Sequence, residues 1–204
     1  MKSKKSKNIL FVDGSNLYGG LTDLLAPGEY LDFGSFLTEI EKDIKISKVK
    51  FYGTYMSIDS SQSSAQQLIA KAQVEFFNNV KSHPKVDFYE GNFSKTTGKE
   101  KGVDVKLAVD LALGACLDEY KEAIIMTGDA DLAYAVIKAK ELGKQVHLAA
   151  FASRFPYAFS FSVNKRFVYD YKNYFQKKAL PLYRKPPRYL NIRDITKEVK
   201  RLQV

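Results

Sequence analysis

Five short apolar segments alternate with segments of helical pattern along the first 150 residues of the chain. The apolar segments are residues 8–12, 48–56, 86–93, 122–128 and 145–151. The stretches between them repeat apolar residues every three or four positions, and they cover residues 30–44, 60–82, 103–117 and 131–143. Strands that alternate with helices favour a parallel sheet with helices on both faces. The pattern therefore predicts an α/β fold around a mostly parallel central sheet of about five strands.

The pattern loosens after Phe151, where loops and short elements are expected. Residues 166–175 (RFVYDYKNYF) are interpreted as an edge strand or a docking segment, and the proline-containing residues 177–190 as an extended linker. A short amphipathic helix is expected over residues 191–204. The predicted organisation is a basic tail at 1–7, one domain at 8–175 and a basic C-terminal extension at 176–204.

Composition excludes several classes of protein. No stretch approaches the roughly 18–20 apolar residues that cross a bilayer, and the N-terminus has no apolar run long enough for a secretory signal. A cytoplasmic protein is therefore expected. The single cysteine, Cys116, excludes internal disulfides and a cysteine-based zinc cluster, and its helical surroundings predict a core position. Two histidines are too few for a histidine metal site, so any metal would be held by oxygen.

The net charge of +9 is unevenly distributed. Residues 9–150 carry a net charge of −5, whereas residues 1–8 carry +4 and residues 151–204 carry +10. Basic ends on a mildly acidic body favour a nucleic-acid partner, although basic tails also serve as solubilising surface. Residues 165–178 interleave basic and aromatic side chains, a composition typical of proteins that bind single-stranded nucleic acid. The alternative is that these aromatics pack against their own domain.

Carboxylates follow the predicted strands at the edge where an open α/β sheet binds ligands. Asp13 follows the first strand, Asp104 lies in the first turn of the helix after the third strand, and Asp129 and Asp131 follow the fourth. Each alone also fits a helix cap or a first-turn acid. Together they would repel one another, and a bound Mg²⁺ or Mn²⁺ would remove that cost.

Two aspartates of one predicted helix have different surroundings in the sequence. Asp104 shares a face with the apolar residues Leu107 and Leu111, which should point at the sheet. Asp110 follows Lys106 by four positions, so an ion pair on the helix surface accounts for it.

Three motifs in this order resemble the NYN domain family, in its LabA-like branch, which is related to the PIN-domain ribonucleases. They are VDGSN (12–16), KGVDVKLAVD (101–110) and TGDADL (127–132), and KELGKQVHL (140–148) follows them. The resemblance covers roughly residues 8–170. It implies a PIN-like three-layer α/β/α sandwich, a divalent-metal site for Mg²⁺ or Mn²⁺, and hydrolysis of RNA phosphodiester bonds by a metal-activated water.

The resemblance also assigns roles to residues of this chain. The implied catalytic residues are Asp13, Asn16, Asp104, Asp129 and Asp131, of which the four aspartates would hold metal. The residues expected to contact substrate are Asn16, Thr127, Lys95, Lys99, Lys101 and Arg154. Thr127 stands where the family usually has serine, which keeps a hydroxyl group. The implied substrate is single-stranded RNA, cleaved to leave a 5′-phosphate.

Other functions remain open on the sequence alone. The first alternative is a catalytically weak or inactive RNA-binding or regulatory module of the same fold. A phosphatase with an aspartate nucleophile usually needs a second aspartate two residues after the first, where this chain has Ser15. A nicotinamide-type site is disfavoured because no GxGxxG motif follows the first strand. Whether the chain pairs with a second copy or with a regulatory protein also stays open.

Overall fold

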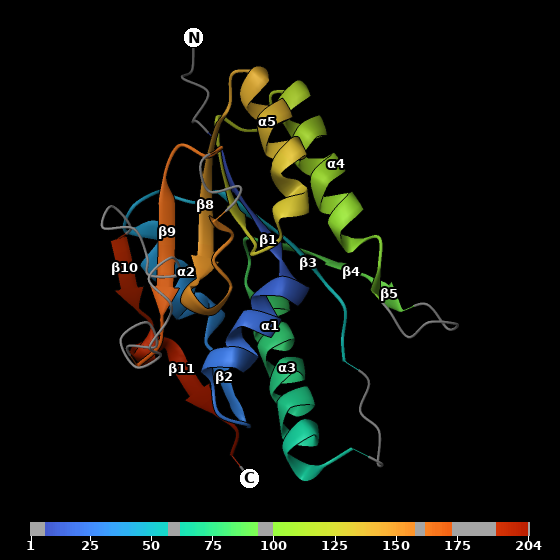
Figure 1. The fold of residues 1–204 in the computed structure, drawn as a ribbon, viewed down its shortest axis with the longest axis vertical. Helices are drawn as coiled ribbons and strands as arrows, with labels where there is room; N and C mark the ends of the chain where they lie inside the picture. Colours follow the sequence, from blue (N-terminus) through green and yellow to red (C-terminus); the bar gives the residue numbers. More distant parts are fainter. Residues whose placement is uncertain (1–6, 57–61, 94–99, 158–161, 173–190, 204) are drawn as a thin grey trace.

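The computed structural model describes residues 7–56, 62–93, 100–157, 162–172 and 191–203 (Figure 1). Its centre is a seven-stranded sheet in the order β10-β9-β8-β7-β1-β3-β4, in which every neighbouring pair is parallel. These strands are β1 (Asn8–Asp13), β3 (Lys48–Gly53), β4 (Val86–Glu90), β7 (Glu122–Met126), β8 (Gln145–Phe151), β9 (Arg166–Asp170) and β10 (Asn191–Asp194). The predicted α/β fold with a mostly parallel sheet is confirmed, with two more strands than expected.

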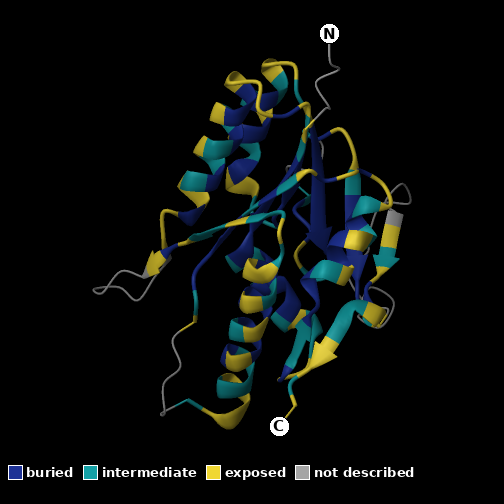
Figure 2. Cartoon of the chain, turned by 180° about the vertical axis from the view of Figure 1, so that it is seen from behind, coloured by how far each residue is buried: buried dark blue, intermediate teal, exposed yellow. Residues whose placement is uncertain are grey.

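Helices cover both faces of this sheet and produce three layers (Figures 1 and 2). The side chains of β1 divide between the two faces, because Leu10 and Val12 pack on one side and Ile9 and Phe11 on the other. The first face is covered by α1 (Gly14–Leu24), α2 (Phe33–Glu41) and α3 (Ser64–Ser82). The second face is covered by α4 (Val103–Cys116) and α5 (Ala133–Glu141).

Side-chain caps decide where several helices begin. Ser63 and Gln66 form a reciprocal capping box that starts α3 within the predicted serine-rich region. Asp32 accepts a hydrogen bond from the backbone N–H of Ser35, so α2 starts at Phe33 rather than at residue 30. The residues before this cap form a short strand, β2 (Glu29–Leu31), which the helical pattern over 30–44 concealed.

The third predicted strand is divided in two. Residues 86–90 form β4, whereas β5 (Asn92–Phe93) leaves the sheet and pairs antiparallel with β6 (Glu100–Lys101). β5 and β6 therefore form a short antiparallel hairpin immediately before α4. Residues 94–99 lie outside the described part of the chain.

The expectations for the C-terminal region were wrong in two respects. Strand β9 is not an edge, because β8 and β10 flank it, and its aromatic residues Phe167 and Tyr169 are buried in the core. Residues 191–203 form no amphipathic α-helix. They instead contribute β10, a 3-10 helix η4 (Thr196–Glu198) and β11 (Val199–Arg201), which pairs antiparallel with β2. The predicted linker at 177–190 lies outside the described residues.

Two further properties of the described chain bear on the expectations from composition. Cys116 was expected in the core but is exposed at the end of α4, because the buried stripe of this helix runs through Leu107, Leu111 and Ala115 instead. No helix in the described ranges is long and apolar enough to cross a membrane.

Candidate functional site

Three of the predicted site aspartates line one cavity at the carboxyl edge of the sheet. Asp13 is the last residue of β1, Asp104 lies in the first turn of α4, and Asp129 lies between β7 and the 3-10 helix η1 (Ala130–Leu132). The cavity has a volume of about 380 Å³. Its lining residues are Asp13, Ser15, Asn16, Val103, Asp104, Asp129 and Arg154. Segments more than 100 residues apart in the sequence therefore meet here.

Asp13 is both a helix cap and a cavity-lining residue. Its Oδ1 accepts a hydrogen bond from the backbone N–H of Asn16 at 3.0 Å, which caps α1. Its Oδ2 accepts a hydrogen bond from the Thr127 hydroxyl at 2.9 Å. The two interpretations of Asp13, as a helix cap and as a site carboxylate, are thus compatible. The cap holds a buried carboxylate in place, and this carboxylate still lines the cavity.

Thr127 connects the two loops that carry Asp13 and Asp129. Its hydroxyl donates to Asp13 and accepts a hydrogen bond from the backbone N–H of Asp129 at 2.9 Å. Asp129 Oδ1 in turn accepts from the backbone N–H of Asp131 at 2.9 Å. Thr127 is buried and does not line the cavity, so its contacts are those of a residue that positions carboxylates. Asp131 is exposed and also lies outside the lining.

The backbone of the loop after β7 orients the side chain of Asn16. Its Oδ1 accepts a hydrogen bond from the N–H of Gly128 at 2.7 Å. A backbone donor must face the amide oxygen, so the amide nitrogen of Asn16 points away from it. A Cβ at Gly128 would come within 2.3 Å of the Arg154 carbonyl and 2.8 Å of Asn16 Oδ1. Only glycine therefore allows this close approach.

Asp104 is exposed in the first turn of α4, two residues after Gly102, which has a left-handed backbone with φ of 77°. No hydrogen bond or ion pair joins the side chain of Asp104 to another residue of the described ranges. The predicted apolar face behind it is confirmed, because Leu107 and Leu111 are fully buried against the sheet. The position of Asp104 is thus set by helix packing and not by contacts of its carboxylate.

Arg154, at the end of the 3-10 helix η2 (Ala152–Arg154), supplies a cation beside the cavity. Its Nε donates to Asp23 Oδ2 at 2.8 Å, and both side chains are partly exposed. The guanidinium lies against α1, where a Cβ at Gly19 would approach it to 2.2 Å. Lys101 is exposed on β6 and does not line the cavity, whereas Lys95 and Lys99 lie outside the described residues.

The donor set is suited to a hard divalent cation, although the carboxylates do not form a closed cage. Carboxylate and amide oxygens are the ligands that Mg²⁺ and Mn²⁺ prefer. Within the described ranges, no group of three or more Asp, Glu, His or Cys side chains is arranged to hold a metal ion. Mg²⁺ commonly keeps several waters and binds proteins through one or two carboxylates. The cavity therefore fits a hydrated ion held by fewer direct ligands than the sequence implied.

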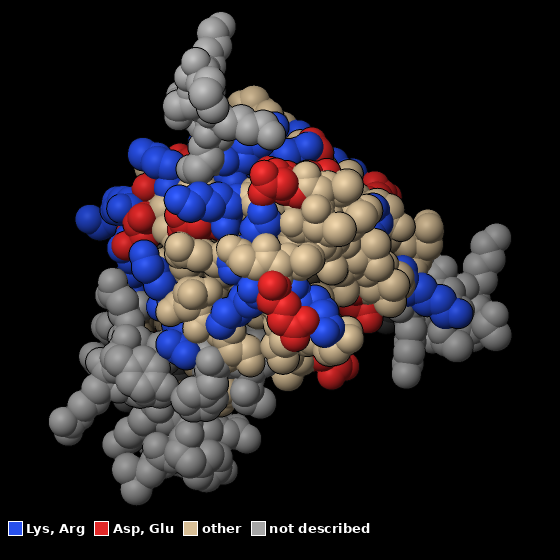
Figure 3. Space-filling model, turned by 90° about the horizontal axis from the view of Figure 1, so that it is seen from above, with Lys and Arg blue, Asp and Glu red and all other residues tan. Residues whose placement is uncertain are grey.

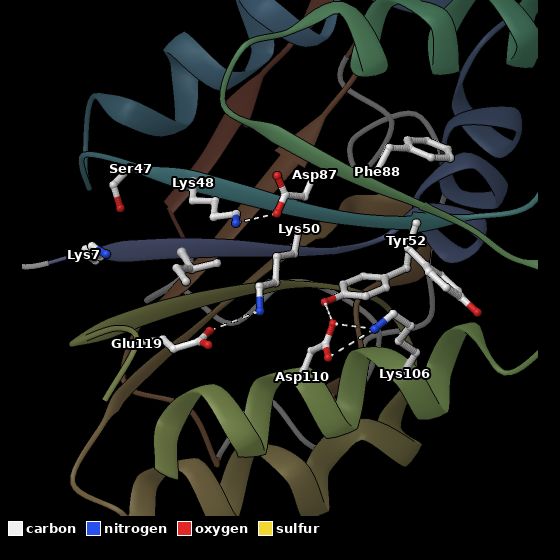
Figure 4. Close-up of a pocket in the computed structure, with 12 residues that line it drawn as sticks. Lys7, Ser47, Lys48, Lys50, Tyr52, Asp87, Phe88, Lys106, Asp110 and Glu119 are labelled. Carbon is white, nitrogen blue, oxygen red and sulfur yellow. Dashed lines mark hydrogen bonds and ion pairs between the residues drawn. The ribbon is translucent and has the colours of Figure 1, made fainter. Parts of the chain in front are cut away.

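A second cavity, of about 490 Å³, lies on the sheet face between α4 and the edge strand β4 (Figure 4). Each of its acids is paired with a lysine. Lys50 lies 3.3 Å from Glu119, Lys106 lies 3.1 Å from Asp110, and Lys48 pairs with Asp87. The Tyr52 hydroxyl also donates to Asp110 at 2.8 Å. Burial raises the pKa of Tyr52, and this hydrogen bond raises it further. The predicted Lys106–Asp110 pair is confirmed.

One polar residue that lines the cavity at the carboxyl edge was not predicted as a site residue. Ser15 lines the acidic cavity from the first turn of α1, two residues after Asp13 within the VDGSN motif. It was considered only as a departure from a phosphatase pattern. The signal that could have identified Ser15 is its position, because it is a polar residue in the turn directly after the strand that ends at Asp13.

Comparisons with known proteins agree with the fold and identify the family. The crystal structure of a protein of unknown function from Vibrio parahaemolyticus resembles this chain with a TM-score of 0.56 and 15% sequence identity, covering 82% of this chain and 96% of that one. This likeness shows a shared fold. No curated protein matches the chain. The family model described as NYN domain matches residues 7–171, which is most of the sequence, and the chain belongs to the NYN domain family.

Proposed function

We propose that this protein is a divalent-metal-dependent ribonuclease, in the LabA-like branch of the NYN family. The observation that supports the proposal best is the shared cavity of Asp13, Asp104 and Asp129, which come from three separate segments. The family membership adds a PIN-like nuclease fold. The three motifs of the sequence support the LabA-like assignment.

Asp13, Asp129 and Asp104 would hold Mg²⁺ or Mn²⁺ through one or two direct ligands, with the remaining carboxylate acting through water. When bound, such an ion lowers the pKa of a coordinated water and offsets the charge of the phosphoryl oxygens. Thr127 keeps the carboxylates of Asp13 and Asp129 in fixed relation through its hydroxyl. Asp131 supports Asp129 through its backbone N–H and would act from outside the cavity.

The substrate phosphate would be bound by donors on the opposite side of the cavity. The amide nitrogen of Asn16 has no hydrogen-bond partner within the described ranges, because the amide oxygen faces Gly128. It would donate to a phosphate oxygen or to the attacking water. The guanidinium of Arg154 binds Asp23 through Nε, which leaves its terminal nitrogens to contact the RNA backbone. Ser15 adds a hydroxyl donor at the same level.

One observation favours a second candidate, an RNA-binding module with little or no turnover. Within the described part of the chain no three acidic groups are arranged to hold a metal. If the carboxylates cannot approach one another when RNA binds, the protein would bind RNA without hydrolysing it.

Cleavage of labelled single-stranded RNA in Mn²⁺, in Mg²⁺ and in chelator tests the proposal. Asp104→Asn is the informative variant, because its carboxylate has no contact within the described fold. Asp110→Asn is the matched control, since it removes an acid from the same helix, outside the cavity. We expect metal-dependent products with 5′-phosphate ends, retained in the control and lost in Asp104→Asn.

The other outcomes are also decisive. RNA binding that chelator does not change, without products in any metal, supports the RNA-binding module. Cleavage that survives both chelator and Asp104→Asn refutes the proposed site.

A further inference from the structure

The outer surface of α4 carries a row of exposed apolar side chains that the nuclease proposal does not use. Val105, Val109 and Leu113 follow one another at intervals of four residues, and Leu117 continues the row just past the end of the helix. Residues four apart lie on the same side of an α-helix. Their exposed fractions lie between 51% and 62%, so more than half of the surface of each residue is open to solvent in the described chain.

The neighbouring helix α5 extends this apolar surface. Helices α4 and α5 lie side by side on the same face of the sheet (Figures 1 and 2). Tyr134 and Ile137 are 69% and 41% exposed on α5, and Leu142 is 50% exposed at its C-terminal end. Viewed from above, the molecule shows a broad area of mostly uncharged side chains in the part that contains these helices (Figure 3). We call these seven residues the α4–α5 surface.

The α4–α5 surface is as large as the largest apolar patches that isolated domains usually expose. From their exposed fractions, the seven side chains present apolar area on the order of 600 Å², the upper limit of about 300–600 Å² for the largest patch of a typical monomer. A standard interface buries about 800 Å² per partner, including its polar rim. The apolar centre is therefore large enough for a stable dimer.

The charges near this surface favour a partner of the same kind. Lys138 pairs with Glu141 at 2.7 Å, and Lys144 pairs with Asp118, so the rim carries both signs in balance. RNA would need unpaired cations, which this face does not offer among these residues. A second copy of the chain, in contrast, would bring an equally apolar and equally balanced surface, despite the net charge of +9.

We infer that the α4–α5 surface is the interface of a homodimer, in which the exposed apolar rows of two copies pack against each other. The inference does not depend on nuclease activity. Because Asp104 begins α4 and Asp131 precedes α5, the interface would also fix the helices that carry these acids.

Sedimentation equilibrium of the full chain at micromolar concentration tests the inference. We expect a mass of twice 23.1 kDa for the wild type. The double variant Val109→Glu and Leu113→Glu should sediment as a monomer, because each glutamate would be buried unpaired against the other copy. Ile192→Glu is the matched control, since Ile192 is an exposed apolar residue on β10, and it should remain dimeric.

A second measurement does not depend on the folding of a variant. Cys116 is the only cysteine, is exposed, and lies between Leu113 and Leu117 in sequence. A pyrene label there should give excimer fluorescence in the dimer that disappears on dilution to the monomer. If the wild type is monomeric at all concentrations, the inference is refuted and the surface would have to bind another protein. A dimer that survives both glutamates, or that shows no excimer, would place the interface elsewhere and refute it equally.

Discussion

The cavity at the carboxyl edge of the sheet and the cavity between α4 and β4 are each lined by three acids, but these acids have different partners. In the cavity between α4 and β4, Asp87, Asp110 and Glu119 each have a lysine partner (Figure 4). In the cavity at the carboxyl edge, Asp129 accepts a hydrogen bond from a backbone N–H, and the carboxylate of Asp104 has no hydrogen bond or ion pair within the described ranges. The nearby cation Arg154 binds Asp23, which lies outside the lining.

This difference separates structural acids from acids suited to a ligand. A lysine partner satisfies a carboxylate electrostatically, so the second cavity is close to neutral without any added ion. Neutral donors fix the direction of a carboxylate but leave its negative charge in place. Asp104 and Asp129 therefore lack a cationic partner within the described ranges, which suits a divalent cation, whereas every acid of the larger cavity has a lysine partner.

Asp13→Asn should give the largest effect that distinguishes the two cavities. Asparagine remains a good helix cap, so α1 should still form, but the negative charge is removed. We expect RNA cleavage to fall by about 100-fold or more, since even partners of metal ligands commonly account for about 10–100-fold. The readout is the initial rate in Mn²⁺ at saturating RNA. Asp87→Asn is the control in the second cavity, and equal losses in both variants would remove the distinction.

The main elements of the site were predictable because they depend on local patterns. An apolar strand followed by Asp13, and an acid that heads the buried Leu107–Leu111 stripe, are both visible in the sequence. The contacts of Thr127 with Asp13 and Asp129 were not, because they join residues 114 positions apart through one hydroxyl. The pairing of Arg154 with Asp23 was equally invisible, since it spans 131 positions.

Metal binding should stabilise the fold, and this stabilisation should depend on the acidic cavity alone. At a Mn²⁺ concentration of ten times the Kd, mass action predicts about 1.4 kcal/mol. For a chain of this length that corresponds to a rise in Tm of about 3–6 °C. Calorimetry should find the rise in wild type and in Asp110→Asn but a smaller one in Asp104→Asn. A rise of the same size in all three would assign metal binding to another site.

Removing Asp110 should weaken the fold even without metal, unlike removing Asp104. Asp110→Asn loses the pair with Lys106 and weakens the bond from Tyr52, for about 1 kcal/mol in total. Asp104→Asn loses only its interaction with the helix dipole, which 0.15 M salt reduces to a few tenths of a kcal/mol. Urea unfolding of both variants checks this order. The opposite order would mean that the second cavity is not stabilised by its pairs.

The failures in the C-terminal region have a common physical cause. Residues 191–203 contain apolar residues at spacings that fit a helix, and they form strands because β9 and β2 offer unpaired backbone edges. Tertiary pairing overrides local propensity in such short segments. Ile195 is fully buried in the core. Lys200 pairs with Asp32, the residue that caps α2, and these two residues are far apart in the sequence.

The smallest predicted effect concerns the pair of His147 and Glu122, which lies outside both cavities. His147 is fully buried on β8 with Nε2 3.1 Å from Glu122, and its Nδ1 has no hydrogen-bond partner in the described structure. Burial lowers the pKa of His147 below its ordinary value of 6.5, although Glu122 opposes the shift. The unfolded chain therefore binds this proton more tightly than the folded one.

The contribution of His147 to stability is thus fully present above pH 6.5 and is lost as the pH falls toward the folded-state pKa. Between pH 7 and pH 6 the free energy of unfolding should fall by at most about 0.7 kcal/mol, the limit for an imidazole that stays neutral in the folded chain. Urea unfolding at the two pH values measures this slope, and His147→Gln should flatten it. A slope that survives the substitution would come from other groups, and a wild-type stability that rises as the pH falls would mean that Glu122 keeps the imidazole protonated. Glu122 would then be balanced by a cation, like the acids of the second cavity, and neutral donors would no longer mark a carboxylate that retains its charge.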